Sequence, residues 1–241
     1  MQVYFYKKFQ YYSENLRSFT MIQGEYTGTL VEGVREGKGM LVWTNGDRFE
    51  GEFKNGMRHG RGVYIEANGH KYDGEWGLSV KCGRGKESWS NGDQYEGEYA
   101  KDVFNGAGEL TTKGGRYKGH FKKGLKDGLG VMMFKNGGKF EGHWRNGRFH
   151  GKGVYIWADG RKYEGEWKEG ERSGTGVMSF INGERHDGIY YENKKHGAGW
   201  WRLTNGKVRP GEWKNDVLAR WTGPEQFEAQ MKAKQARKIL K

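Results

Sequence analysis

The sequence predicts an all-β fold: an elongated, single-layer, twisted antiparallel meander of stacked β-hairpins, with a short C-terminal α-helix. The first observation behind this prediction is glycine, which supplies 43 of 241 residues, whereas proline supplies 2. The second is an aromatic content of 15%, including 10 tryptophans, in a chain whose mean hydropathy is −1.01. Disordered chains are poor in aromatic residues and collagen needs proline, so both classes are excluded. The third is a pattern that recurs about every 23 residues.

Eight copies of this pattern follow one another, and each begins with an aromatic residue or a histidine. The starts are Tyr26, Phe49, Tyr72, Tyr95, Tyr117, Phe140, Tyr163 and His186, and a truncated ninth copy begins near Arg209. When each start is counted as position 0, positions 2, 11, 13 and 20 are glycine in all eight copies, and position 4 is always large and apolar or aromatic. Repeats three, four and eight have no glycine at position 7, and copies eight and nine begin with His186 and Arg209 in place of an aromatic residue. We expect these repeats to be less regular or to act as end caps.

Each repeat is predicted to be a two-stranded hairpin. Positions 0, 2 and 4 alternate large side chains with glycine, and polar residues such as Glu50 and Glu52 lie between them, which is the period of a strand with one apolar face. Positions 11 to 17 alternate in the same way. A step such as Asn45-Gly46 then supplies the positive φ of a hairpin turn. Glycine within strands lets rings of neighbouring strands lie over bare backbone, so stacked hairpins stabilise one another.

The chain is expected to divide into an aromatic-rich N-terminal cap at 1–25, eight repeats at 26–208, a partial ninth repeat at 209–221 and a basic C-terminal helix at 222–241. The N-terminal segment is either a cap over the first sheet edge or a strand that docks with a partner. Thr222 and Glu225 have the spacing of a capping box, with Pro224 in the first turn. The helix either closes the last sheet edge or binds a partner or an anionic surface.

The repeat Tyr-x-Gly-x-Trp-x-x-Gly-x-x-x-Gly-x-Gly, followed by Asn-Gly, resembles the MORN repeat (membrane occupation and recognition nexus). The clearest copy begins at Tyr163 and continues through Trp167 to Gly176. This family includes junctional membrane proteins, plant phosphatidylinositol-phosphate kinases, lysine methyltransferases, parasite cytoskeletal rings and radial spoke heads of cilia. The resemblance therefore implies a binding or scaffolding array. Segments 58–62 and 149–153 look like the radial-spoke version, although histidine at this place is common in MORN repeats.

The aromatic face is the predicted site of protein binding, because a one-layer sheet cannot hide such a face and exposed apolar patches mark partners. Positions 4 and 17 supply the candidates, which are Trp43, Trp76, Trp89, Phe134, Trp144, Trp157, Trp167 and Trp213. The simpler explanation is that much of this face is the core of the protein. We expect a peptide strand, a helix or a second array to lie along it, and a homodimer is one such arrangement.

Basic residues at position 9 are the second candidate site, and they are predicted to lie in loops. The net charge is +12 and the pI is about 9.5. The candidates for binding anionic lipid headgroups are Arg35, Arg58, Lys81, Lys126, Arg172 and Lys195. Positions 1 and 3 are often acidic, so the array carries stripes of opposite sign. These stripes are either ordinary solvation with cross-strand pairing or a docking surface for an acidic partner.

No catalytic residue, cofactor or metal site is expected. A catalytic site needs an acid, base or nucleophile that converges in a pocket, and the pattern brings none together. The Gly-x-Gly pairs lie between strands, which excludes a phosphate loop. His59, His150 and His196 share position 10 in separated repeats and cannot share a zinc ion. Cys82 is expected to have no role, the flanking segments are too short for a kinase or methyltransferase domain, and no apolar run is long enough to span a membrane.

Together these features predict a non-enzymatic, protein-binding MORN scaffold in the cytoplasm, in a cytoskeletal or ciliary assembly of the axonemal, radial-spoke-like kind. Its partners are expected to be cytoskeletal or axonemal proteins. The alternative is an adaptor that binds phosphoinositides or a membrane surface, which the positive net charge favours. A nucleic-acid partner is not expected, because the charges are interspersed and no recognised nucleic-acid-binding module occurs.

Overall fold

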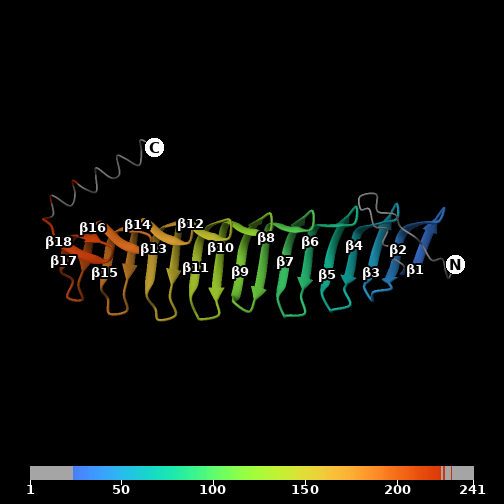
Figure 1. The fold of residues 1–241 in the computed structure, drawn as a ribbon, viewed down its shortest axis with the longest axis horizontal. Helices are drawn as coiled ribbons and strands as arrows, with labels where there is room; N and C mark the ends of the chain where they lie inside the picture. Colours follow the sequence, from blue (N-terminus) through green and yellow to red (C-terminus); the bar gives the residue numbers. More distant parts are fainter. Residues whose placement is uncertain (1–23, 224, 226–228, 230–241) are drawn as a thin grey trace. The chain divides into compact units, whose positions relative to one another are not determined.

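The computed structural model describes residues 24–223 together with residues 225 and 229, and it confirms the all-β fold class. Within these described residues, eighteen strands form one open antiparallel sheet, in which strands adjacent in the chain pair with each other (Figure 1). Residues 24–223 contain no helix. The predicted N-terminal cap and C-terminal helix lie largely outside the described residues.

The described residues form two compact units. Unit 1 comprises the described residues up to Lys113 together with Phe121–Gly124, and unit 2 comprises Gly114–His120 together with the described residues from Leu125 onward. The strands of unit 1 are β1 (Gly24–Val31), β2 (Val34–Trp43), β3 (Arg48–Lys54), β4 (Met57–Ile65), β5 (Lys71–Gly77), β6 (Val80–Ser88), β7 (Gln94–Ala100) and β8 (Val103–Thr112). β9 (Gly115–Lys122) has residues in both units. The strands of unit 2 are β10 (Leu125–Phe134), β11 (Lys139–Arg145), β12 (Arg148–Ile156), β13 (Lys162–Lys168), β14 (Glu171–Ser179), β15 (Arg185–Tyr191), β16 (Lys194–Arg202), β17 (Val208–Lys214) and β18 (Val217–Trp221).

Paired glycines form a continuous track across each unit. In the β3–β4 hairpin Gly51 lies opposite Gly62, and Gly62 in turn lies opposite Gly74 of β5. Positions 2 and 13 of successive repeats pair in this way throughout. The track runs through Gly28, Gly39, Gly51, Gly62, Gly74, Gly85, Gly97 and Gly108 in unit 1, and through Gly130, Gly142, Gly153, Gly165, Gly176, Gly188, Gly199 and Gly211 in unit 2.

The side chain at position 0 lies on this glycine track. Phe140 is fully buried, and a Cβ atom added at Gly153 would lie 2.5 Å from its Cζ. Where position 0 is tyrosine, the hydroxyl also finds a backbone acceptor: Tyr72 donates to the Glu75 carbonyl at 3.0 Å and Tyr163 to the Glu166 carbonyl at 3.2 Å. Rings packed on bare backbone therefore form the core of each hairpin.

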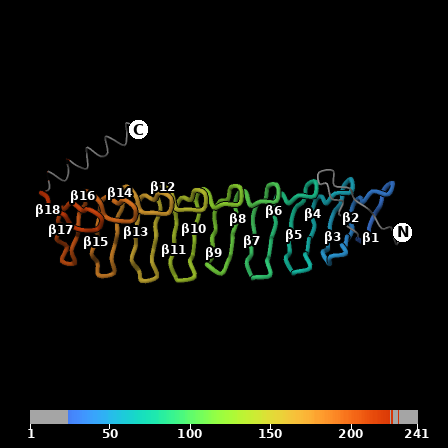
Figure 2. The backbone as a smooth tube through the Cα atoms, viewed as in Figure 1, coloured from blue at the N-terminus to red at the C-terminus, as the bar shows by residue number. Residues whose placement is uncertain are grey.

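Each hairpin bends sharply near one end (Figure 2), because a bulge interrupts the strand pairing beyond the glycine track. In β3–β4 the register shifts between Gly51 and Glu52, and Gly60 at position 11 has a φ of 59°, in the left-handed region that favours glycine. The Glu52 carboxylate accepts a hydrogen bond from the Arg61 backbone N–H at 3.3 Å. Part of the predicted acidic stripe therefore supports the bulge.

Two kinds of turn connect the strands. The two-residue turn lies at positions 6 and 7, where both residues have positive φ, as in Asn55 (51°) and Gly56 (78°), which is the type I′ geometry of tight hairpins. The predicted Asn-Gly turn also has its positive φ, which is 91° at Gly46. It is wider, since the Gly46 N–H donates to the Trp43 carbonyl at 2.9 Å and the Trp43 N–H to the Asp47 carbonyl at 2.8 Å.

The repeats without glycine at position 7 are as regular as the others, so the expectation that they are less regular is wrong, while a role as end caps stays a prediction. Ser79, Asp102 and Asn193 take the same positive φ, between 65° and 67°. Each side chain also accepts a backbone hydrogen bond from the preceding hairpin: Asp102 from the Lys81 N–H at 2.7 Å and Asn193 from the Arg172 N–H at 2.9 Å. This bond compensates for the strain of a non-glycine residue.

β17 and β18 pair beyond the eighth repeat, with Gly211 opposite Trp221. This hairpin lies in the segment for which the sequence predicts a partial ninth repeat. The division of the chain into cap, eight repeats, partial ninth repeat and helix stays a prediction.

The packing of rings on the glycine track predicts that a side chain added at a track glycine destabilises the fold. Gly153→Ala should lower the free energy of unfolding by about 2–3 kcal/mol, because the new methyl group would overlap the buried Phe140 ring. Urea unfolding measures the change. Gly223→Ala is the control, since nothing lies within 4 Å of a Cβ atom there. Equal stability of the two variants would contradict the role of the track.

Candidate binding surfaces

The four tryptophans at position 4 belong to the core. Trp76, Trp144, Trp167 and Trp213 are 3–6% exposed. The Trp76 indole N–H donates to the Gly62 carbonyl of the preceding repeat at 3.0 Å, and the Trp76 ring packs edge-to-face on Phe49, with centroids 5.4 Å apart. The expectation that a one-layer sheet leaves this face open does not hold at position 4, because rings of adjacent repeats cover one another.

The four candidates at position 17 are half-buried and keep part of their rings accessible. Trp43 packs on Tyr64 in unit 1, with centroids 5.7 Å apart. In unit 2, Trp157 and Phe134 lie 4.7 and 5.7 Å from Tyr155. Trp89 stacks on His70, with an interplanar angle of 11°. The structure thus separates the predicted aromatic site into a buried row at position 4 and an accessible row at position 17.

The six basic residues at position 9 lie in strands, and their placement in loops is therefore wrong. Each is the second residue of its strand, directly after the two-residue turn: Arg35 in β2, Arg58 in β4, Lys81 in β6, Lys126 in β10, Arg172 in β14 and Lys195 in β16. The turn is shorter than the sequence suggested, so position 9 is already paired. All six are buried or half-buried.

These cations lie over the rings of the core. The Arg58 guanidinium is 4.1 Å from the centroid of Trp76, and the Lys126 ammonium is 4.9 Å from the centroids of both Tyr117 and Trp144. Arg35 lies 5.2 Å from Phe53, and Lys195 lies 4.8 Å from Trp201. Cation–π attraction of this kind gains strength when the cation is partly removed from water.

Arginine at position 9 also binds the next hairpin. The Arg58 Nη2 donates to the Ser79 carbonyl at 2.9 Å, while the Ser79 backbone N–H donates to the Arg58 carbonyl at 3.0 Å. Burial lowers the pKa of Arg58, Lys126 and Lys195 below their ordinary values. Position 9 therefore has a structural role, and its charges are committed to the rings and carbonyls around them.

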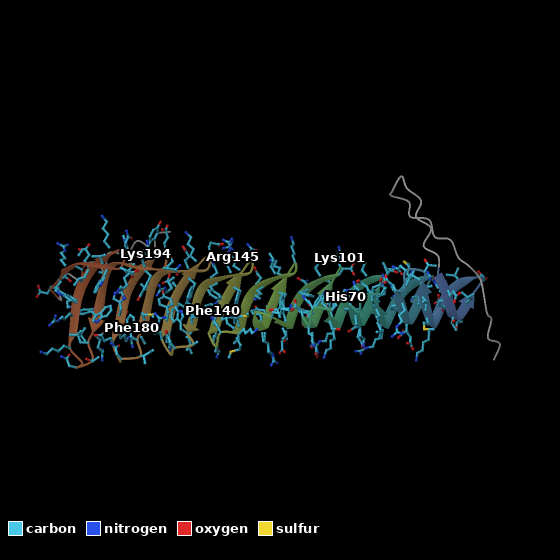
Figure 3. All side chains as sticks on the ribbon, turned by 60° about the horizontal axis from the view of Figure 1, so that its bottom comes forward. His70, Lys101, Phe140, Arg145, Phe180 and Lys194 are labelled. Carbon is cyan, nitrogen blue, oxygen red and sulfur yellow. The ribbon has the colours of Figure 1, made fainter. Side chains whose placement is uncertain are left out.

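Two phenylalanines at position 9 reveal the same role, which the sequence reasoning missed. Phe104 stacks on Tyr95 with centroids 3.6 Å apart, and Phe149 stacks on Phe140 at 3.8 Å. The signal was present in the sequence, because cations and aromatic rings both pack favourably on another ring, and position 9 holds one or the other in every full repeat. Figure 3 shows Phe140 against the strands of unit 2, whereas Arg145 and Lys194 lie at hairpin edges.

A buried carboxylate lies among the rings of unit 1. Glu87 occupies position 15, where the other repeats have leucine, tyrosine, methionine or tryptophan. It pairs with the Lys81 ammonium, lies 2.7 Å from the His70 Nε2 and accepts a hydrogen bond from the Tyr99 hydroxyl at 2.8 Å. Burial and this hydrogen bond raise the pKa of Tyr99. These three partners satisfy Glu87, which the periodic pattern did not single out.

A buried histidine replaces the tyrosine of position 0 in unit 2. The His186 ring is fully buried, its Nδ1 lies 2.8 Å from the Tyr190 hydroxyl, and its Nε2 has no hydrogen-bond partner within the described residues. Burial, with a smaller contribution from the Lys195 charge, lowers the pKa of His186 to about 3. The ring therefore stays neutral in the folded protein at physiological pH.

The polar face of unit 2 carries a groove of about 860 Å³ over β10–β15. Val154 and Val177 line it together with charged side chains. The Lys162 ammonium lies 2.8 Å from the Glu164 carboxylate and lowers the pKa of Glu164. Adjacent charges thus neutralise one another, and the groove has no dominant sign.

Among residues 24–223, 225 and 229, no group of histidine, cysteine, aspartate or glutamate side chains is arranged to hold a metal ion. No described helix has the length and apolar character needed to cross a membrane.

The family model for the MORN repeat matches eight consecutive segments, at residues 26–48, 49–71, 72–94, 95–115, 117–139, 140–160, 163–185 and 186–208. The chain belongs to the MORN-repeat family. The matched segments begin at the eight starts that the sequence predicted, and each supplies the hairpin described above. No curated protein sequence matches the chain.

Several solved structures are similar to the chain at low sequence identity. The wild-type TCP10 domain of Danio rerio CPAP is 13% identical, with a TM-score of 0.43 and coverage of 84% of this chain and 95% of that chain. Its complex with a Danio rerio STIL peptide is 12% identical, with a TM-score of 0.45 and coverage of 82% and 99%. The Drosophila melanogaster SAS-4 TCP domain, in complex with a proline-rich motif of Ana2, is 13% identical, with a TM-score of 0.40 and coverage of 64% and 85%. The family assignment depends on the repeats alone.

The two kinds of cation at position 9 should respond differently to neutral substitution. Arg58→Met should lower the free energy of unfolding by about 2 kcal/mol, because the hydrogen bond to the Ser79 carbonyl is lost. Lys126→Met should change it by less than about 1 kcal/mol, since burial already disfavours the ammonium. Urea unfolding followed by tryptophan fluorescence measures both, and equal losses would contradict this distinction.

His186 should make stability depend on pH. Its folded pKa of about 3 lies below the ordinary 6.5, so between these values the unfolded chain binds a proton that the folded chain excludes. Stability should therefore fall by up to about 1.4 kcal/mol for each pH unit below 6.5 and be insensitive to His186 above it.

His186→Tyr should remove this pH dependence of stability, because it removes the imidazole. The fold accepts tyrosine at positions 0 and 4 of one repeat, as Tyr95 and Tyr99 show. Thermal unfolding between pH 7 and pH 4.5 measures the slope. His120→Gln, at an exposed histidine, is the control and should keep the wild-type slope. An unchanged slope in His186→Tyr would show that other groups cause the acid sensitivity.

Proposed function

We propose that this protein is a non-enzymatic, protein-binding scaffold that acts in the cytoplasm, within a cytoskeletal or ciliary assembly of the axonemal, radial-spoke-like kind. The observation that carries the proposal is the accessible aromatic row at position 17, formed by Trp43 and Trp89 in unit 1 and by Phe134 and Trp157 in unit 2. Half-buried aromatic side chains on a fixed sheet lose little entropy when a partner covers them, which makes them common anchors of interfaces.

The cytoskeletal part of the proposal is supported by the resemblance of segments 58–62 and 149–153 to the radial-spoke version of the repeat. His59 and His150 hold position 10 in these segments, and both are half-buried beside the stacked residue of position 9. A partner protein along the aromatic row, or a second copy of the chain, is the arrangement we propose.

The alternative function is an adaptor for phosphoinositides or an anionic membrane surface. The net charge of +12 favours it. Against it, the six position-9 cations proposed to bind headgroups lie over rings and are buried or half-buried. A lipid headgroup would have to compete with the contacts that hold adjacent hairpins together.

Affinity capture from a cytoskeletal or ciliated-cell extract tests the proposal. The wild-type chain should retain identified cytoskeletal or axonemal proteins. The double variant Trp89→Ala/Trp157→Ala should retain at least about ten-fold less partner protein than the wild-type chain, because each ring contributes interface area. Tyr191→Ala is the matched control, since Tyr191 is an exposed aromatic residue at a hairpin tip outside the row. Quantitative mass spectrometry measures the recovery.

Liposome flotation separates the two functions. The scaffold proposal expects no salt-sensitive binding to vesicles that contain phosphoinositides. Binding that disappears in Arg58→Gln/Lys81→Gln/Lys126→Gln, but persists in the control Arg48→Gln/Lys71→Gln/Lys86→Gln, would support the lipid adaptor. The absence of any cytoskeletal protein in the capture experiment would contradict the scaffold.

A further inference from the structure

The hairpin tips of unit 1 carry exposed apolar side chains. Val34, Met57 and Val103 hold position 8 and are 45%, 36% and 43% exposed. Leu78 holds position 6 of the third repeat and is 70% exposed. We call these four residues the apolar tip row, and each comes from a different hairpin.

The repeat itself does not require apolar residues at these tips. In unit 2, position 8 is apolar in Leu125 of β10 and Val217 of β18, which are 48% and 68% exposed, but it is charged in the three hairpins between them, as Arg148, Glu171 and Lys194. These hairpins have the same pairing register at the glycine track as those of unit 1. The repeat therefore folds with either a charged or an apolar residue at position 8, and the side chain that needs an explanation other than folding is Leu78 at position 6.

Leu78 is unfavourable for the fold in two respects. Its φ is 52°, in the left-handed region that a Cβ atom disfavours, and its side chain lies mostly in water. The equivalent residues of the other hairpins are asparagine, glutamate or lysine. Asparagine, as at Asn55, is the residue that tolerates this conformation best. A leucine that costs stability at an exposed tip is typical of a contact with a partner.

Successive tips lie side by side. The Ser79 N–H donates to the Arg58 carbonyl at 3.0 Å, the Asp102 N–H to the Lys81 carbonyl at 3.1 Å and the Gly124 N–H to the Phe104 carbonyl at 2.9 Å. Hairpins that follow one another in a sheet are about 9.6 Å apart, which is two strand spacings. An α-helix advances about 10.5 Å in seven residues. A helix with one apolar residue in each heptad thus matches the spacing of the tips.

The charges beside the tip row favour an acidic helix. Lys54 and Lys101 lie at the tips next to Leu78, and Lys122 and Lys123 lie at the following tip; all four are exposed. Figure 3 shows Lys101 at the hairpin edge. The carboxylate of Asp102, in the same region, accepts a hydrogen bond from the Lys81 N–H. The exposed charges around Leu78 and Val103 are therefore mostly positive, whereas the first tip, beside Val34, carries the exposed Glu32.

We propose that the apolar tip row binds an acidic amphipathic helix of another protein. Leu78 is the central contact, with Met57 and Val103 on the adjacent hairpins. The four lysines face the acidic residues that flank the apolar stripe of the helix. This surface is distinct from the aromatic row of position 17 and leaves that row accessible to its own partner.

A synthetic helical peptide tests this surface. The probe is about three heptads long, with leucine at positions a and d and glutamate at e and g. Fluorescence anisotropy against the full chain should show saturable binding that weakens as salt is raised. A scrambled peptide of equal composition and a peptide with lysine in place of glutamate should bind at least ten-fold more weakly.

Leu78→Asn makes the test specific, because it should keep or raise the thermal midpoint while weakening peptide binding by roughly ten-fold or more. Glu192→Asn places the same residue at the same turn position of repeat eight and should leave binding unchanged. Lys101→Glu/Lys122→Glu should weaken binding and reduce its salt dependence. Unchanged affinity of Leu78→Asn, or equal binding of the scrambled peptide, would overturn the proposal.

Two further outcomes would assign the tip row to another occupant and overturn the helix proposal. One is binding to phosphatidylserine vesicles that depends on Leu78 when the peptide does not bind. The other is a wild-type dimer that Leu78→Asn converts to a monomer, which sedimentation measures.

Discussion

Every repeat depends on one contact, the packing of the position-0 ring on two glycines that face each other across its hairpin. Phe140 on Gly142 and Gly153 shows the arrangement: a side chain at Gly153 would overlap the ring, and one at Gly142 would overlap the backbone of the facing strand at Gly153 and Lys152. Full burial of such a ring contributes about 1.5–3 kcal/mol. Because this gain comes from the backbone of the same hairpin, each repeat builds its own share of the core and the array extends by adding repeats.

The remaining positions of the repeat follow from that contact. A ring on one face needs cover from the neighbouring hairpin, and position 4 supplies it as an edge-to-face partner whose indole binds a track carbonyl, as Trp76 does. The residue at position 9 covers these rings with a cation or with a second ring, as Arg58 does over Trp76 and Phe149 does on Phe140. The bulge at position 11 turns the strand so that these layers can meet. The residue types that recur in the repeat are thus those that the packing of rings within and between hairpins requires.

Function is expected where a repeat departs from this packing pattern. The fold tolerates polar residues at hairpin tips, so the apolar side chain of Leu78 at a strained position stands apart from the requirements of folding. Glu87 departs in another way, because its buried charge is balanced within the protein by Lys81 and His70. An unfavourable side chain that stays exposed, such as Leu78, indicates contact with a partner. A charged side chain whose partners all lie within the protein, such as Glu87, indicates a role in the fold.

The sequence by itself determined the repeat phase, the hairpin within each repeat and the glycine lattice, because these depend on residues close together in the chain. It also identified the aromatic and basic candidates. Only the tertiary structure decided which of them remain accessible. Trp76 at position 4 and Trp157 at position 17 were both candidates for the aromatic site, yet one is buried and the other half-buried, and Arg58 lies over a ring of the next repeat. Burial depends on which side chain of an adjacent hairpin covers which ring, and that contact is set by the bend of the strands and not by their period.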